Sequence, residues 1–529
     1  MTRPILVTMA MLECAAFLPA VRGQGSLLAF EGDRAGDQLG SSVSGLGDID
    51  ADGIGDLIVG AWQGGLVGDG GYARVYSGRD GHVLFTFFGD NFDPWGDGDA
   101  LGYSVAGAGD VNGDGVPDMI VGSPWDDLVG FDTGSAKVFS GKNGSLLYAF
   151  SGTPGDISEF GRGIAGPGDL NGDGFADLVV GAPRDDSFQP SAGKVWFFSG
   201  ANGAVMDGIA GSNAGDTLGW SAAAAGDLNA DGFADCVVGA PAFDSLSSSG
   251  RVLAYSGKGR AVLLNLTNGL TGDLLGFSVA GVGDANGDGV PDILAGAVDD
   301  GSTGVEAGSA TLFSGRDGSA LSRRFGEQAN DHFGWSASGT GDANGDGLPD
   351  LIVGMFHTTP PSVTGYAALF SGRTSQRLYR FEGDLTVYDQ YGYSVSGAGD
   401  INRDGLADVM IGVPNHDPYG SDSGAALVLA GSPLFLDAEP RSANAGQVVT
   451  LTAREQPAGT DLLLVVVAVN GSPVFMPLVK GTFDATETWL ISGQVPPGLS
   501  GITAAFRTYA RNGPLGPVIH SSDETILFR

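Results

Sequence analysis

One acidic pattern recurs along most of this chain at a nearly constant interval. It reads Gly-Asp-x-Asn/Asp-x-Asp-Gly-x-x-Asp, is followed by an apolar run and a glycine, and occurs seven times in 529 residues. Successive copies are separated by 62, 59, 58, 57, 58 and 58 residues. The leading aspartates are Asp48, Asp110, Asp169, Asp227, Asp284, Asp342 and Asp400. Such regularity predicts a series of equivalent structural units.

Each repeat has the same order of short strand-like runs. A Leu-Gly, Phe-Gly or Tyr-Gly pair opens the repeat, and a strand of small residues such as 104–107 leads into the acidic loop. An apolar strand (177–180 in the third repeat) and a third strand (136–139 in the second) follow. An Asp-Gly or Asn-Gly hairpin turn then leads to a fourth strand, such as 145–150. Four antiparallel strands per repeat form one propeller blade, so the sequence predicts an all-β, seven-bladed β-propeller.

The two ends of the repeat region predict how the ring closes. The seventh repeat stops after its third strand, at 425–430, and lacks a fourth. A matching segment precedes the first repeat: residues 26–33 resemble the fourth strand of the sixth repeat at 377–384. We expect this N-terminal strand to complete the last blade, which leaves no exposed sheet edge at the junction.

The acidic loops have the composition of calcium sites. Calcium takes six to eight oxygen ligands at variable angles, and a loop of this spacing supplies them from the side chains at positions 1, 3, 5 and 9 and from the carbonyl at position 7. Glycine at position 6 permits the sharp turn. The predicted ligands are Asp48, Asp50, Asp52, Ile54 and Asp56; Asp110, Asn112, Asp114, Val116 and Asp118; Asp169, Asn171, Asp173, Phe175 and Asp177; Asp227, Asn229, Asp231, Phe233 and Asp235; Asp284, Asn286, Asp288, Val290 and Asp292; Asp342, Asn344, Asp346, Leu348 and Asp350; and Asp400, Asn402, Asp404, Leu406 and Asp408.

The charge of the chain agrees with this interpretation. The net charge is −36, of which residues 433–529 carry −2, so the other 432 residues carry −34. A surface of this sign repels nucleic acid and anionic membranes and attracts divalent cations. About seven Ca²⁺, one per blade, would reduce the negative charge of the propeller from −34 to about −20. The first loop has four carboxylates where the others have three, so we expect it to bind calcium most tightly unless Gly55 loosens it.

Loops of this composition are also compatible with structures that hold no calcium. The same residues can form ordinary Asx-turns without a metal, although seven intact copies favour calcium. Magnesium is disfavoured because a flexible cage of protein oxygens suits the larger ion. Zinc is disfavoured because the five scattered histidines, together with Cys236, form no ligand cluster.

The repeats resemble a known family. Phe160-Gly161 followed by Gly181-Ala182-Pro183 is similar to the FG-GAP repeat of the integrin α-subunit propeller and of bacterial secreted relatives, and the resemblance extends over residues 25–431. It implies a calcium-stiffened propeller used in extracellular recognition. The chain differs from integrins because all seven repeats carry the acidic loop and no inserted ligand-binding domain interrupts them.

The expected function is therefore extracellular recognition or cell adhesion, with structural calcium and an extracellular protein or glycan as the ligand. The alternative is a secreted hydrolase or lyase on a propeller scaffold. Candidate nucleophiles and acid pairs recur at fixed repeat positions, which favours structural roles, and no Gly-x-Ser-x-Gly or His-Glu-x-x-His motif occurs. We therefore expect no enzymatic activity. The recurring groups are Ser104, Ser221, Ser278, Ser336 and Ser394, and the pairs Asp126-Asp127, Asp185-Asp186 and Asp299-Asp300.

Residues that break the repeat pattern are candidate recognition surface, although packing between blades would explain each of them equally well. They lie in the loops that connect strands and blades. They are Phe92-Asp93-Pro94-Trp95, Trp125, Phe131, Phe188, Phe356-His357 and His416 to Tyr419.

The remaining segments complete the predicted organisation. Residues 1–23 are typical of a secretory signal, with Arg3 before an apolar stretch, so we expect a secreted or cell-surface protein. No later apolar run is long enough to span a bilayer. The propeller is predicted over 24–432, and a linker over 433–446. Six strand-like runs in 447–529 predict a small β-sandwich of immunoglobulin-like type.

Overall fold

The computed structural model describes residues 26–431 apart from 64–69, 90–97, 245–248, 269–270, 357–364, 384–388 and 420, together with the backbone of the strands between 435 and 528. All the regular elements in these residues are β-strands. No helix in this part of the chain is long and apolar enough to cross a membrane. The predicted signal segment, 1–23, lies outside the described residues.

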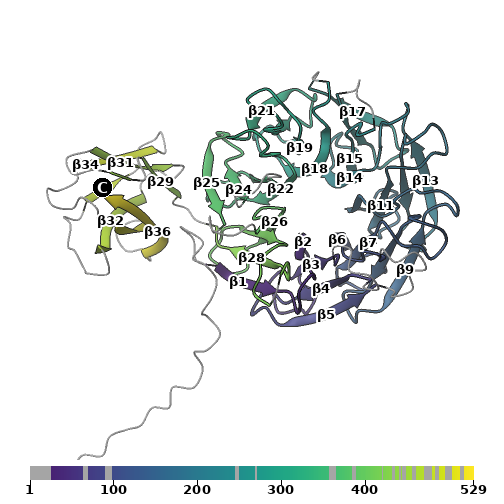
Figure 1. Cartoon of the computed structure of the whole chain (residues 1–529), viewed down its shortest axis with the longest axis horizontal. Coiled ribbons are helices and arrows are strands. Elements are labelled where there is room, and N and C mark those ends of the chain that lie inside the picture. Colours follow the sequence, from purple (N-terminus) through teal and green to yellow (C-terminus); the bar gives the residue numbers. More distant parts are fainter. Residues whose placement is uncertain are drawn as a thin grey trace, which may run out of the picture.

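Seven four-stranded antiparallel sheets form a ring in which the first strand of each sheet is innermost (Figure 1). The predicted seven-bladed β-propeller is confirmed. The first strands are β2 (Leu39–Gly45), β6 (Ser104–Gly109), β10 (Ile164–Gly168), β14 (Ser221–Gly226), β18 (Leu275–Gly283), β22 (Ser336–Gly341) and β26 (Ser394–Gly399). The second strands are β3 (Leu57–Ala61), β7 (Asp118–Ser123), β11 (Asp177–Ala182), β15 (Asp235–Ala240), β19 (Asp292–Ala297), β23 (Asp350–Gly354) and β27 (Asp408–Val413).

The outer half of each sheet is made by its third and fourth strands. The third strands are β4 (Tyr72–Tyr76), β8 (Ser135–Phe139), β12 (Lys194–Phe198), β16 (Arg251–Tyr255), β20 (Ser309–Phe313), β24 (Tyr366–Phe370) and β28 (Ala425–Leu429). The fourth strands are β5 (Val83–Phe88), β9 (Leu146–Ser151), β13 (Val205–Ala210), β17 (Val262–Leu266), β21 (Ala320–Phe325), β25 (Arg377–Glu382) and β1 (Ser26–Glu31).

The ring closes through its N-terminal strand. β1 pairs antiparallel with β28, with Phe30 opposite Ala426, so the seventh sheet has the order β1-β28-β27-β26. Phe30 also stacks on Tyr76 of the first blade at 4.0 Å between ring centroids. Leu39 bridges to Gly424 in parallel, as equivalent residues do at five other blade junctions. The junction between the first and last blades therefore repeats the geometry of the others.

The core consists of apolar layers between neighbouring blades. The second strands are buried along their whole length, which explains their continuous apolar sequences, because both faces of each strand pack against other blades. Cys236 lies in one of these layers with Val238 and Tyr255. Burial raises the pKa of its thiol to about 12, so it remains an uncharged apolar group.

Hydroxyl groups at one repeat position join neighbouring blades. Ser104 Oγ donates to the carbonyl oxygen of Gly161 in the next blade at 2.8 Å, and Ser394 Oγ donates to that of Gly40 at 2.7 Å across the closure. The accepting glycine has a positive φ, +92° at Gly40, where a side chain would also collide with Ala425 O. Both residue types therefore recur for structural reasons. Ser42, Ser221 and Ser278 make the same contact.

The C-terminal strands pair into two sheets, β29-β31-β34 and β30-β36-β35-β32-β33. The predicted linker, 433–446, includes β29 and β30, each of which pairs within one of these sheets. An immunoglobulin-like sandwich in 447–529 stays a prediction, as do the domain boundaries. The strands are β29 (Phe435–Glu439), β30 (Ser442–Ala443), β31 (Val448–Arg454), β32 (Thr460–Val469), β33 (Val479–Thr482), β34 (Thr488–Gln494), β35 (Thr503–Asn512) and β36 (Val518–Phe528).

Candidate functional site

Each acidic loop connects the first and second strands of a blade and is wound around the carboxylate at position 1. In the second loop, Asp110 accepts hydrogen bonds from the amides of Gly113 (2.7 Å), Asp114 (3.0 Å) and Gly115 (2.8 Å). Gly113 and Gly115 have φ values of 72° and 84°, which bend the chain around this carboxylate. The same positive φ values occur at positions 4 and 6 of all seven loops.

The carboxylate at position 9 is buried and links the loop to the third strand. Asp118 is fully buried; its Oδ2 accepts from Val111 N and its Oδ1 from Gly141 N, both at 2.9 Å. Gly141 follows β8, so one side chain holds the loop, β7 and the hairpin together. Equivalent bonds are made by Asp56, Asp177, Asp235, Asp292, Asp350 and Asp408.

Burial also raises the pKa of these position-9 carboxyls. The pKa reaches about 6 for Asp118, Asp292 and Asp408 and about 8 for Asp350, the last raised further by the nearby charge of Asp346. Burial removes the water that would stabilise the ionised carboxylate, so ionisation at this depth is favoured by a positive charge nearby. A divalent cation among the loop oxygens would supply that charge.

The first loop brings three carboxylates together most closely. Asp48, Asp50 and Asp56 each place one oxygen within 4.8 Å of the other two, and among the described residues this is the one group of three acidic, histidine or cysteine ligands that meets this distance. Asp52 is not part of the group. Position 3 in the other loops is asparagine, which supplies a neutral amide oxygen in place of the third carboxylate.

The donor set fits calcium. Every predicted side-chain ligand is a carboxylate or amide oxygen, and the carbonyl at position 7 completes the set. In the sixth loop Asn344 Oδ1 accepts from Asp346 N at 2.8 Å, which holds positions 3 and 5 on one turn. A carboxylate has about four lone-pair sites. Asp110 accepts three amides, so one site remains on it for a cation.

Arginines reach the position-5 aspartate in some blades. Arg316 Nε lies 3.2 Å from Asp288 Oδ2, and Arg373 Nε lies 3.5 Å from Asp346 Oδ1, both from the hairpin between the third and fourth strands. The contact of Arg79 with Asp52 is longer, at 3.9 Å. The fifth and sixth loops therefore already have a cation beside one predicted ligand.

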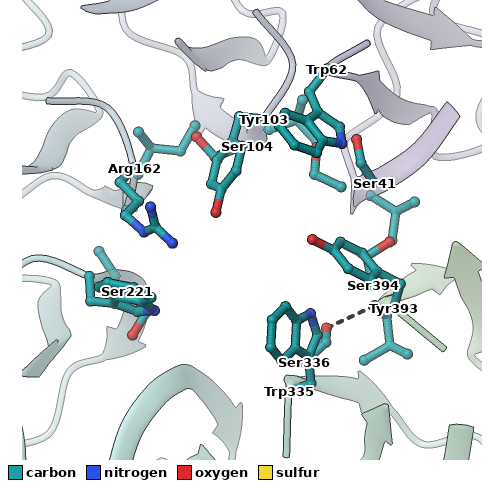
Figure 2. A pocket seen from close by; sticks show the side chains of 18 of the residues that line it. Ser41, Trp62, Tyr103, Ser104, Arg162, Ser221, Trp335, Ser336, Tyr393 and Ser394 are labelled. Carbon is teal, nitrogen blue, oxygen red and sulfur yellow. Dashed lines mark hydrogen bonds between the residues drawn. The ribbon is translucent and has the colours of Figure 1, made fainter. Parts of the chain in front are cut away.

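The opposite face of the propeller carries a different feature. Each first strand runs from its Gly pair to its acidic loop, so these two positions lie on opposite faces of the ring. Where the first strands begin, a pocket of about 250 Å³ lies on the ring axis (Figure 2). The residue after the Gly pair lines it in each blade. These residues are Ser41, Tyr103, Arg162, Trp220, Phe277, Trp335 and Tyr393.

Aromatic contacts continue from blade to blade around this pocket. Ring centroids are 5.4 Å apart for Trp220 and Phe277, 4.7 Å for Phe277 and Trp335, and 5.5 Å for Trp335 and Tyr393. The guanidinium of Arg162 lies 3.7 Å from the Trp220 centroid and 5.2 Å from that of Tyr103. Trp62, which follows β3, lines the pocket beside Ser41.

This pocket was not predicted from the sequence. Its aromatic residues directly precede the recurring serines, whose hydroxyls are the more obvious candidates for chemistry. A signal was nevertheless present, because Ser41, Tyr103, Arg162, Trp220 and Phe277 differ in chemistry at one equivalent position while their neighbours repeat. A surface position that varies among structurally equivalent repeats is a candidate for recognition.

The residues predicted as recognition surface have several environments. Trp125 packs on Trp62 at 5.1 Å and Phe356 on Trp335 at 4.5 Å, so both support the wall of the axial pocket. Phe131, Phe188 and Tyr419 are exposed. His416 pairs with Asp389 at 3.2 Å. Positions 92–95 and 357 lie outside the described residues.

The recurring acid pairs, which are candidate glycosidase carboxylates, do not line the axial pocket. Asp126 accepts from Leu128 N at 2.9 Å and from Ser135 Oγ at 2.5 Å, and Asp185 accepts from Ser187 N at 2.8 Å. Asp300 forms an ion pair with Arg323 Nη2 at 2.5 Å. These aspartates hold the loops between second and third strands.

Comparison with known proteins agrees with this architecture. The family model described as FG-GAP repeat matches residues 101–139, 160–198, 218–255 and 391–429. This is an integrin-like FG-GAP propeller. It is 30% identical to integrin alpha-V of Gallus gallus over 256 residues, or 45% of this chain and 24% of the relative. It is 32% identical to integrin alpha-5 of Xenopus laevis over 252 residues, or 44% of this chain and 22% of the relative.

The FG-GAP chain thus spans about a quarter of the length of these curated relatives. A shorter match, 37% identical over 141 residues, joins it to integrin alpha-7 of Mus musculus and covers 25% of this chain and 12% of the relative. A solved structure of a fungal alcohol oxidase of the AA5 family, in complex with copper, aligns over 96% of this chain and all of its own with a TM-score of 0.43 and 11% identity. A similarity this low supports no statement about activity.

Proposed function

We propose that this FG-GAP propeller is a secreted or cell-surface protein of extracellular recognition or cell adhesion, with about seven calcium ions as structural cofactors, one per blade. The observation that carries the proposal is the construction of the seven acidic loops. Each holds three or four carboxylates on one short turn, and the innermost of them, at position 9, is buried.

Electrostatics supports a cation in these loops. Like charges a few ångströms apart repel, and the repulsion grows as the groups lose contact with water. In the first loop Asp48, Asp50 and Asp56 lie within 4.8 Å of one another. A calcium ion bound there would turn this repulsion into attraction and add a folded-state constraint that the unfolded chain lacks.

The position of the loops explains how calcium would stabilise the blade. Each loop begins at the end of the first strand, and its last ligand begins or directly precedes the second strand. Through the bond from Asp118 to Gly141 N, the same ligand reaches the third strand. An ion coordinated by the loop would therefore fix three of the four strands of each blade.

The pocket supports recognition over catalysis. Its lining residues include no Asp, Glu or His in the described part of the chain, and Arg162 is their one charged side chain. Most glycoside hydrolases use a pair of Asp or Glu residues beside the bond that they cleave, and no such pair lines the pocket among the described residues. Similarity to integrin alpha chains and the predicted signal segment support an extracellular location.

Thermal melting during a calcium titration tests this proposal. We expect chelation with EGTA to lower the melting temperature of the full chain by more than about 10 °C, because several sites each add stability in proportion to their occupancy. Added Ca²⁺ should restore the original melt, and Mg²⁺ at the same concentration should restore less of it. An unchanged melt after chelation would refute the structural role of calcium. An array of glycans and matrix proteins, probed with the calcium-loaded chain, then searches for the ligand.

A further inference from the structure

We propose that the axial pocket binds a sugar unit that carries a carboxylate, with Arg162 holding the carboxylate and the surrounding aromatic rings packing against the sugar. The proposal deepens the recognition function and rests on it. It is based on three features of the pocket: the donors of Arg162, the absence of acidic side chains from the described lining, and the aromatic side chains that five blades contribute at one repeat position.

Arg162 presents free donors to the pocket. Its Nη1 donates to Glu159 Oε2 at 2.7 Å, and this is the one hydrogen bond that its guanidinium makes to described residues. The guanidinium points toward the open centre of the ring (Figure 2). Glu159 also pairs with Arg184 at 2.6 Å, so its charge is shared between two arginines. Nε and Nη2 of Arg162 are therefore available to a carboxylate, the planar anion that a guanidinium binds best.

The charge of the pocket selects the sign of the ligand. The propeller is strongly acidic, yet the pocket lining contains one arginine and no carboxylate in the described residues. Aromatic cages can bind cations, but here the guanidinium of Arg162 already lies 3.7 Å from the Trp220 ring centroid. A second cation would meet this charge at short range. The lining therefore favours an anionic group.

The walls suit the rest of a sugar. Rings of Tyr103, Trp335 and Tyr393 surround the opening in Figure 2, and the rings of Trp220 and Phe277 also line the pocket. Such rings offer flat apolar surfaces to the C–H faces of a pyranose. The hydroxyls of Tyr103 and Tyr393 point into the opening and make no hydrogen bond to the described residues. Burial raises the pKa of Tyr393, so its hydroxyl remains a donor at neutral pH.

Size limits the ligand to one unit. A volume of about 250 Å³ lies just below the roughly 300–1,000 Å³ typical of small-molecule sites. The pocket is bounded on all sides by side chains of different blades, so it admits one terminal ring and offers no groove for an extended peptide. A terminal uronic acid of an extracellular glycan combines the required ring, hydroxyls and carboxylate.

Calorimetric titration of the full, calcium-loaded chain tests the proposal. The probes are glucuronate, galacturonate, neutral glucose and a short aspartate-containing peptide, with tryptophan fluorescence as a second signal from Trp220 and Trp335. We expect at least one uronate to bind at least about tenfold more tightly than glucose and than the peptide, since one charge-assisted contact is worth that much. Binding of neither uronate, or equal binding of the peptide, would overturn the proposal.

Variants locate the site. Arg162→Gln should weaken uronate binding at least about tenfold. Arg380→Gln is the matched control because Arg380 also lies over a tyrosine ring, Tyr366, at 4.0 Å and pairs with Glu327 at 3.0 Å, but outside the pocket. It should leave binding unchanged. Tyr393→Phe keeps the ring and should weaken binding less. Equal uronate affinity of the Arg162 and Arg380 variants would contradict the assignment, and a retained calcium-dependent melt in each shows that the recognition site alone has been tested.

Discussion

The two faces of the propeller use the same repeat in opposite ways. On one face, seven acidic loops place an aspartate at positions 1, 5 and 9 and glycine at position 6 without exception. On the other face, one repeat position holds serine, tyrosine, arginine, tryptophan or phenylalanine, depending on the blade. The first strands that connect the two faces are nearly alike. Repetition therefore marks what every blade needs to fold, and variation at an equivalent position marks what the assembled ring presents to a ligand.

The difference has a physical cause. A loop aspartate such as Asp177 bonds only within its own blade, to Leu170 N and Gly200 N, so each blade must carry its own copy. A pocket residue such as Trp335 contacts Phe277 and Tyr393 of the neighbouring blades and faces open space. We therefore expect it to contribute less to folding than the loop aspartates, which would leave its identity free to differ from blade to blade.

The largest expected effect is on the loop face. Asp177→Ala removes the acceptor of two buried amides and one predicted calcium ligand, so we expect a loss of about 3–5 kcal/mol in the free energy of unfolding. Urea unfolding in the presence of calcium measures it. Asp177→Asn, which keeps one carbonyl oxygen, is the matched control and should cost less. A loss below about 1 kcal/mol for the alanine variant would contradict the distinction between the faces.

A smaller effect is expected where an arginine competes with calcium. Arg316→Ala removes the guanidinium beside Asp288. We expect calcium to bind the fifth loop severalfold more tightly in this variant, because the positive charges of the ion and the guanidinium repel each other. Calorimetric calcium titration should show the gain in the weakest class of sites. Lys142→Ala, on the equivalent hairpin of the second blade, removes a cation with no ion pair among the described residues and should change nothing. Equal curves for both variants would rule out the competition.

Conservative exchange on the pocket face should have little effect on folding. Trp335→Phe keeps an aromatic ring between Phe277 and Tyr393, so we expect a stability change below about 1 kcal/mol. Urea unfolding of Trp335→Phe, measured together with the two Asp177 variants, compares the free energies of unfolding directly. A cost as large as that of Asp177→Ala would show that the pocket ring is as necessary for folding as the acidic loops.

The smallest effect concerns pH and also belongs to the pocket face. His416 Nδ1 lies 3.2 Å from Asp389 Oδ2, and this hydrogen bond, with the nearby charges of Glu31 and Asp417, raises the pKa of His416. Because the folded pKa is raised, the stabilisation is present below the unfolded pKa of about 6.5 and is lost as pH rises through the folded value. His416→Gln should therefore lower the melting temperature more at about pH 6 than at about pH 8.5. An equal loss of melting temperature at both pH values, or a larger loss at the higher pH, would exclude a charged pair between His416 and Asp389.

Much of the fold could be predicted from the sequence. The spacing of the acidic loops and the match of 26–33 to 377–384 indicate seven blades, because each blade is built from local strand pairs whose signals lie within one repeat. The axial pocket could not be predicted in the same way. Tyr103 and Tyr393 are 290 residues apart, and only closure of the ring brings them to one opening.

The acidic loops were predictable in composition but not in detail. The spacing indicates the ligands Asp110, Asn112, Asp114 and Asp118, whereas the bond from Asp118 to Gly141 N depends on how β7 and β8 pair. The contact of Arg373 with Asp346 likewise arises from the folding of a hairpin onto a loop of its own blade. Neither contact follows from the sequence of the loop itself.

Counting bound calcium ions by native mass spectrometry of the folded chain tests the central claim most directly. We expect about seven ions per chain at saturation, with the ions of the fifth and sixth loops released first and that of the first loop released last as a chelator is added. A folded chain that binds no calcium, or a single ion in the first loop alone, would contradict that claim.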